Sequence, residues 1–116
     1  MRQGFEPRPG VTISTLAYDY PPKWQVPEHA HACDQLVFAE AGVMEVSVAQ
    51  TRWLIPPQFA IRIPAHVRHS IRMPNAVAMR TLYLRPRLSR SRDCTALNVS
   101  PLLRELIVEA VRVGEL

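Results

Sequence analysis

The sequence lacks any long apolar run, which excludes the simplest membrane anchors. No stretch of its 116 residues approaches the roughly 18–20 consecutive apolar residues that cross a bilayer as a helix. The first ten residues, MRQGFEPRPG, also lack the apolar core of a secretory signal. We therefore expect a cytoplasmic protein with no membrane partner.

Cysteine and lysine are scarce. Cys33 and Cys94 lie far apart and form no CxxC pair, so we expect reduced thiols, with Cys33 a conceivable soft metal ligand. Lys23 is the single lysine, and scattered arginines supply the rest of the basic residues behind the net charge of +4. They form no basic helix and no aromatic interleaving, and their densest run, 85–92, is predicted to be a solvated loop. Direct nucleic-acid binding by this chain is therefore not favoured.

Proline, in contrast, is abundant, and its eleven positions divide the chain into short segments rich in β-branched and aromatic residues. Several alternate cleanly, so that Met44, Val46 and Val48 should share one face. Short strands at this spacing predict an all-β sandwich or barrel. The predicted strands are 10–18, 34–41, 43–50, 52–55, 59–63, 68–73, 77–84 and 95–99.

The end of the chain has a different pattern. Ser100 is a good helix N-cap, Pro101 suits the first helical position, and Gly114 is a plausible C-cap. Between them, leucine, isoleucine, alanine and valine recur at roughly helical spacing. The sequence therefore predicts a β-rich body over 1–99 followed by one amphipathic helix over 100–116.

All four histidines fall into two clusters, His29 with His31 and His66 with His69. Residues i and i+2 of a strand point to the same face, so His29 and His31 can present two imidazoles together. His69 and Gln35, from neighbouring strands, could complete a compact site. Three imidazoles suit a divalent ion such as zinc, nickel or iron, and the neutral amide of Gln35 would be a weaker fourth ligand. The pattern predicts either a metal site or the polar rim of a ligand pocket.

The first histidine cluster carries a resemblance to the cupin superfamily, whose first motif is G-x5-HxH-x3-E-x6-G. HAHACDQLVFAEAG, residues 29–42, matches this motif from its first histidine to Gly42. Gln35 replaces the glutamate, and Lys23 stands where the motif opens with glycine. Losing the carboxylate weakens the expected metal affinity and disfavours redox or hydrolytic chemistry.

The second cluster resembles the second cupin motif, G-x5-P-x-G-x2-H-x3-N. PAHVRH, residues 64–69, matches it from the proline to His69, while Gln58 and Met73 replace the opening glycine and the closing asparagine. His66 stands at the inner glycine position, so its backbone is expected to need a positive φ. We interpret His66 as an exposed turn residue rather than a further ligand.

The sequence between and after the two motifs resembles one branch of the cupin superfamily, the N-terminal effector-binding domain of AraC-type transcription regulators. AMRTLYLRP and LNVSPLLRELIVEA carry the likeness most specifically. The resemblance implies a cupin-type double-stranded β-helix, or jelly-roll barrel, with an N-terminal arm over 1–99. It also implies that 100–116 serves dimerisation and begins the linker to a DNA-binding half that this chain lacks. The partners it implies are a small-molecule effector and a second copy of the chain, with DNA reached only through the missing half.

The resemblance also suggests an arm at 18–25, whose aromatic residues either close over a ligand or pack outside the barrel. The expected site residues fall into three groups. The metal ligands are His29, His31, Gln35 and His69. The expected pocket wall consists of Trp24, Val37, Met44, Trp53, Ile71, Met79 and Tyr83. As an alternative, these side chains simply fill the barrel. The dimerisation face is Leu103, Leu106, Ile107 and Ala110.

Two other functions remain open at this stage. A stand-alone metal-dependent cupin enzyme, such as a dioxygenase or an isomerase, would use the same three histidines, His29, His31 and His69. A barrel packed solid would instead favour a dimerising scaffold without a ligand. The sensor domain of a regulator, not an enzyme, is the interpretation that the sequence favours.

Overall fold

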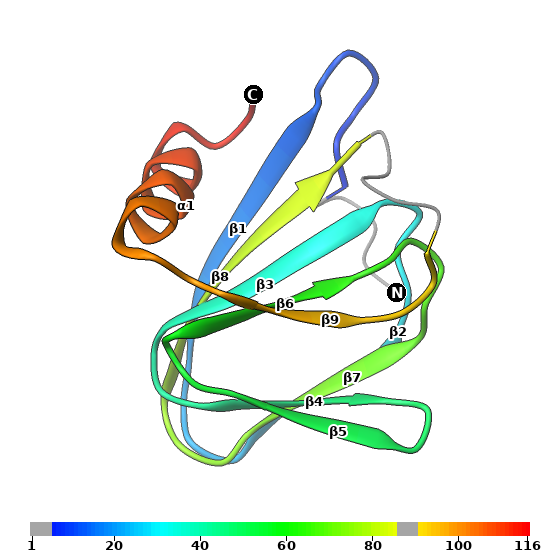
Figure 1. Cartoon of the computed structure of the whole chain (residues 1–116), viewed down its shortest axis with the longest axis vertical. Helices are drawn as coiled ribbons and strands as arrows, with labels where there is room; N and C mark the ends of the chain where they lie inside the picture. Colours follow the sequence, from blue (N-terminus) through cyan, green and yellow to red (C-terminus); the bar gives the residue numbers. More distant parts are fainter. Residues whose placement is uncertain (1–5, 86–90) are drawn as a thin grey trace.

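A computed structural model describes residues 6–85 and 91–116, which form two antiparallel sheets and one helix (Figure 1). The elements are β1 (Ile13–Tyr20), β2 (Trp24–His29), β3 (Asp34–Ala41), β4 (Met44–Val48), β5 (Thr51–Ile55), β6 (Phe59–Ile63), β7 (His69–Met73), β8 (Val77–Leu84), β9 (Thr95–Asn98) and α1 (Pro101–Val113). The sheets have the orders β1-β8-β3-β6-β9 and β2-β7-β4-β5. Because strands far apart in sequence pair as neighbours, the predicted jelly-roll barrel with one C-terminal helix is confirmed.

Strand β2 is the element that the sequence analysis missed. The predicted arm at 18–25 is wrong, because its first residues end β1 and its last residues begin β2. β2 lies at the edge of its sheet, so one of its sides has no partner strand and the missing N–H of Pro27 is tolerated there. The pairing of β2 with β7 also shifts register between Val26 and His29. Proline therefore does not end this strand, as the sequence analysis assumed.

The interior of the barrel is filled by residues that alternate toward it along each strand. Met44 and Val46 are fully buried, and Val48 packs partly buried against the same cluster, as the alternation predicts. Val37 on β3 and Ile61 on β6 lie opposite one another in the ladder and are also fully buried. These side chains belong to one packed cluster that joins the two sheets.

Helix α1 covers the outer face of the five-stranded sheet. Ile107, 1% exposed, packs with Phe38, Ala60 and Leu82, whose side chains point away from the barrel interior. The N-cap is confirmed, since Ser100 Oγ accepts a hydrogen bond from the backbone N–H of Leu103 at 3.1 Å. In the described part of the chain, no helix is long and apolar enough to cross a membrane.

Gly114 ends α1 as predicted, with φ 97° and its N–H donating to Ala110 O at 2.9 Å. The chain then turns back along β1, where Leu116 O accepts from the N–H of Thr12 at 2.8 Å and of Ile13 at 3.0 Å. Most of the predicted loop at 85–92 lies outside the described residues.

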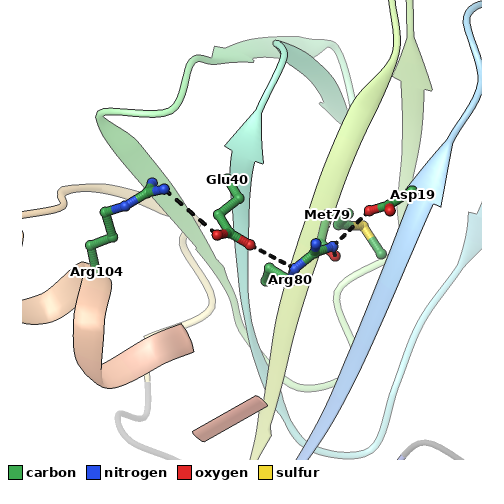
Figure 2. A network of polar contacts seen from close by, with 5 residues as sticks. All are labelled: Asp19, Glu40, Met79, Arg80 and Arg104. Carbon is green, nitrogen blue, oxygen red and sulfur yellow. Dashed lines mark hydrogen bonds and ion pairs between the residues drawn. The ribbon is translucent and has the colours of Figure 1, made fainter. Parts of the chain in front are cut away.

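A chain of ion pairs fixes the helix on the sheet (Figure 2). Arg80 on β8 donates to Glu40 Oε1 at 2.9 Å and to Asp19 Oδ1 at 3.0 Å. Glu40 also faces Arg104 of α1 at 3.6 Å, and that guanidinium lies 5.6 Å from the centre of the Phe38 ring. The network spans β1, β8, β3 and α1, so it orients the helix although each exposed pair contributes little alone.

Three turns adopt a positive φ at positions that the cupin motifs mark with glycine. Gly42 has φ 85°, and a Cβ built there would lie 2.2 Å from Ala76 O, so no side chain fits. Lys23 and His66 have φ of 66° and 67°, and both are exposed. The expectation that His66 is an exposed turn residue with positive φ is confirmed.

Candidate ligand and metal site

Three histidines meet at one end of the barrel. His29 ends β2, His31 lies just beyond it, and His69 begins β7, where it pairs with His29 across the ladder. Their ligand atoms all lie within 4.8 Å of one another, and each residue is at least nine-tenths buried. Around a tetrahedral zinc ion the ligand nitrogens lie about 3.4 Å apart, so ring rotations that bring the three atoms up to about 1.4 Å closer would place all three on one ion. Among the described residues, no other such cluster occurs.

Hydrogen bonds fix which ring nitrogen of each histidine faces the centre. The Nδ1 atoms of His29 and His69 lie 2.8 Å and 2.9 Å from the carbonyl oxygens of Pro27 and Val67. A carbonyl oxygen only accepts, so both Nδ1 atoms carry the proton and leave the Nε2 lone pairs free. Backbone carbonyls orient metal-binding histidines in this way.

The Nδ1 atom of His31 also has an oxygen partner, but the oxygen belongs to a carboxylate instead of a backbone carbonyl. Its Nδ1 lies 3.3 Å from Glu6 Oε2, and this carboxylate also accepts from the Ala32 N–H at 2.8 Å. The Nε2 atoms of His31 and His69 and Oε1 of Gln35 are buried without a hydrogen-bond partner among the described residues. These atoms can all accept and none is matched by a donor. The donor set therefore fits a divalent cation, which would satisfy the acceptors together.

Two of the imidazoles, those of His31 and His69, are neutral at physiological pH. Burial lowers the pKa of His69 to about 4, and the neighbouring His29 and His31 act in the same direction. Burial and the proximity of His29 also lower the pKa of His31, outweighing the carboxylate of Glu6. Lone pairs are therefore available to a metal or to a hydrogen-bond donor without competition from protons.

A buried carboxylate connects the two histidine-bearing segments. Asp34, fully buried, accepts from the Ala65 N–H at 2.9 Å and from Arg62 Nη2 at 3.3 Å. Next to this contact, the His66 N–H donates to His31 O at 2.7 Å. The turn before His69 is thereby fixed to the segment that carries His31, which sets the spacing of the cluster.

A cavity of about 240 Å³ opens from the histidines into the barrel. Its lining is Leu16, Tyr20, Val26, Pro27, His29, His31, Gln35, Ile71, Met79 and Tyr83. The structure thus brings three of the expected wall residues, Ile71, Met79 and Tyr83, to the expected metal ligands. The Tyr83 ring meets the His31 ring edge to face at 5.1 Å.

The other four expected wall residues lie elsewhere. Val37 and Met44 are fully buried in the packed interior. Trp24 is 45% exposed, and its ring lies 6.0 Å from that of Tyr20. Trp53 is half-buried and lines a separate depression beside Cys94. None of the four is among the residues that line the cavity.

Leu16, Val26 and Pro27 went unrecognised as lining residues in the sequence, whereas Tyr20 is one of the 18–25 aromatic residues expected either to close over a ligand or to pack outside. Leu16 and Tyr20 come from β1, and Val26 and Pro27 from the unpredicted strand β2. Alternation along 13–20 was visible, but Tyr18 has the same parity and is 49% exposed. Only the pairing of strands, which the sequence does not state, identifies them.

The expected dimerisation residues divide between the two faces of α1. Leu103, Ile107 and Ala110 pack against the chain's own sheet, so only Leu106 of the expected face is free, at 57% exposure. Leu102 and Val113 are exposed as well, on the same side of the helix. Cys33, the conceivable soft ligand, is a buried free thiol outside the cluster, and burial raises its pKa to about 11.

Comparison with known protein families identifies the family of this chain. The family described as AraC-like ligand binding domain matches residues 13–110. This chain belongs to that family. The domain is 35% identical over 83 residues to the HTH-type transcriptional regulator NimR of Escherichia coli K12, an alignment that covers 71% of this chain. The chain spans 30% of the length of that relative.

Solved structures show the same fold for this AraC-like domain. ToxT from Vibrio cholerae superposes with a TM-score of 0.71 at 10% identity, over 88% of this chain and 48% of that one. A cupin superfamily protein from Desulfitobacterium hafniense superposes with a TM-score of 0.60 at 18% identity, over 63% and 67%. These likenesses confirm the cupin barrel, and the family confirms the resemblance to AraC-type regulators that the sequence motifs carry.

Proposed function

We propose that this AraC-like domain senses a small molecule within a transcription regulator. The observation that carries the proposal is the cavity, apolar along its walls and bordered at its polar end by His29, His31 and Gln35. The structure of the neighbour ToxT holds (E)-4-(8-methylnaphthalen-1-yl)but-3-enoic acid, a small organic molecule, which supports a sensing role for this fold. A cavity of about 240 Å³ lies below the usual range of drug-sized pockets, so the effector is small.

A divalent metal, zinc, nickel or iron, belongs to the proposed site. His29, His31 and His69 would hold it through Nε2, with Gln35 Oε1 as the fourth protein donor. When bound, the ion supplies an electrophilic anchor in an otherwise uncharged cavity. Membership of a regulator family favours binding over turnover, whereas a dioxygenase or isomerase would place its chemistry on the same three histidines.

Sensing would act by shifting a conformational equilibrium. An effector that binds one arrangement of the domain 100-fold more tightly biases it by about 2.7 kcal/mol. In the whole regulator this bias would change promoter binding, which we assign to a part of the protein other than the barrel. Such a regulator works where the promoter is, in the cytoplasm.

Filling the cavity tests the sensing role. Leu16→Trp places an indole in the space, and Leu54→Trp, at a site 68% exposed, is the matched control. In a thermal-shift screen of small metabolites, hits should stabilise the wild type by about 2.7 kcal/mol at 100 times Kd. The control should retain these shifts and Leu16→Trp should lose them. Equal shifts in both variants would place the binding site elsewhere.

A homodimer through the outward face of α1 is the second part of the proposal. Leu102, Leu106 and Val113 form an apolar stripe that no described residue of the chain covers, while the face toward the sheet is already buried. A two-fold axis would pair this stripe with its copy. The contact therefore uses Leu106, but not Ile107, of the residues first expected there.

Leu106→Asp should weaken dimerisation at least about 30-fold, as expected for a central interface residue. The monomer of this variant should remain folded, since the side chain is exposed in one chain. Sedimentation velocity over a concentration series measures the association. Glu105→Lys, a charge change on the adjacent exposed residue, should leave the dimer intact. An unchanged dimer in Leu106→Asp would remove this face from the interface.

A further inference from the structure

The proposed metal site has no negative charge among its donors. Three imidazole Nε2 lone pairs and the amide oxygen of Gln35 are all formally neutral. Among the residues that the structure shows lining the cavity, none has an aspartate, glutamate, lysine or arginine side chain. A divalent cation held there keeps its full charge.

The carboxylates near the histidines are engaged elsewhere. Asp34 accepts from the Ala65 N–H and from Arg62. Glu6 lies behind the His31 ring, on Nδ1 rather than on the Nε2 side, and the Ala32 N–H engages the same oxygen. Glu28 is 57% exposed and pairs with Arg68 at 3.0 Å on the surface. None of these three carboxylates lines the cavity, so none neutralises a cation there by direct contact.

An uncompensated double charge beside apolar walls is costly, so an anion from outside stabilises it. The space next to the histidines is bounded by Leu16, Val26, Ile71 and Met79, which favour a hydrocarbon body. A small anion with an apolar tail satisfies both surfaces, and the volume of about 240 Å³ limits its size.

We propose that the effector is a small organic carboxylate with an apolar body, and that Gln35 sets this preference by keeping the donor set neutral. The inference rests on the proposed metal binding. Gln35 is a specificity determinant here: a carboxylate at its position would supply the anion internally and remove the need for one from the ligand.

Benzoate and benzamide, which differ in charge but hardly in shape, test the preference. Calorimetry should show at least tenfold tighter binding of benzoate to the cobalt-loaded wild type. The chelated apo protein should reverse the order, because its unmatched acceptors favour the N–H donors of benzamide. Visible cobalt absorption should change on adding benzoate. Butyrate should bind the cobalt form about fourfold more tightly per added methylene than acetate.

Gln35→Glu and Gln35→Met separate charge from shape. Gln35→Glu should bind cobalt at least tenfold more tightly and reduce the preference for benzoate over benzamide to below twofold. Gln35→Met keeps the site neutral, and it should retain the benzoate preference even where Gln35→Glu fails to fold.

The outcomes distinguish this inference from the metal proposal. If cobalt does not bind the wild type, the metal proposal and the inference both fail. If cobalt binds but benzamide equals or exceeds benzoate, the inference alone fails. An unchanged preference in a folded Gln35→Glu protein removes Gln35 as the determinant, and equal affinities for acetate and butyrate remove the apolar body.

Discussion

Replacing Asp34 by alanine should lower the free energy of unfolding by about 3–5 kcal/mol, the range for breaking a buried ion pair. Asp34 is fully buried, and Arg62, 9% exposed, donates to it at 3.3 Å. The variant leaves the guanidinium uncompensated, with its Nε already unpartnered among the described residues. It also removes the acceptor of the Ala65 N–H. Urea denaturation of the chelated protein measures the loss.

Two further variants make this result specific. Asp19→Ala breaks another aspartate–arginine pair, but its carboxylate is 78% exposed, so the loss should stay below about 1 kcal/mol. Asp34→Ala combined with Arg62→Met should cost clearly less than the sum of the single variants, because no buried charge remains. A loss of under 1 kcal/mol in Asp34→Ala would show that water already solvates the pair.

The fold was predictable where the sequence pattern reports burial directly. The bounds of β3, β6 and β8 agree with the predicted segments 34–41, 59–63 and 77–84. Glycine, proline or asparagine follows or precedes each of these strands, and all three are central to their sheet. β2 was not predictable by the same rule. Proline interrupts a central strand but is tolerated in an edge strand, and edge position depends on pairing that the sequence does not state.

The candidate site was predictable for its polar end and not for its walls. His29, His31, Gln35 and His69 follow from short-range spacing and from one cross-strand relation, and the structure gathers the three histidines. The walls depend on which strand lies beside which. Val37 and Met44 point inward as alternation predicts, yet they fill the barrel, while Leu16 and Val26 from edge strands border the cavity.

The terminal helix shows the same limit of sequence pattern. An apolar stripe predicts that one helix face is covered, but not whether the chain's own sheet or a second chain covers it. Here Ile107 is 1% exposed against Phe38 and Leu82, so the stripe is mainly an intrachain contact. The additional leucines at 102 and 106, which make the helix apolar on two sides, are the feature that indicates a partner.

The double variant His29→Ala/His31→Ala should lose metal binding more than 100-fold, because loss of even one outer-shell partner of a ligand costs 10–100-fold. At a metal concentration 1,000 times the wild-type Kd, the wild type should gain about 4.1 kcal/mol of stability and the variant at most about 1.4 kcal/mol. Calorimetric zinc titration and thermal unfolding, each after chelation, measure the two effects.

The apo form of this variant should stay folded. Both side chains are more than nine-tenths buried, but the variant also removes the unpartnered Nε2 of His31, which offsets part of the lost packing. His66→Ala, at the exposed fourth histidine, should change neither metal binding nor stability. If the double variant unfolds without metal, the histidines are structural. If it takes up zinc as the wild type does, the metal lies elsewhere and the cavity needs another explanation for its unmatched acceptors.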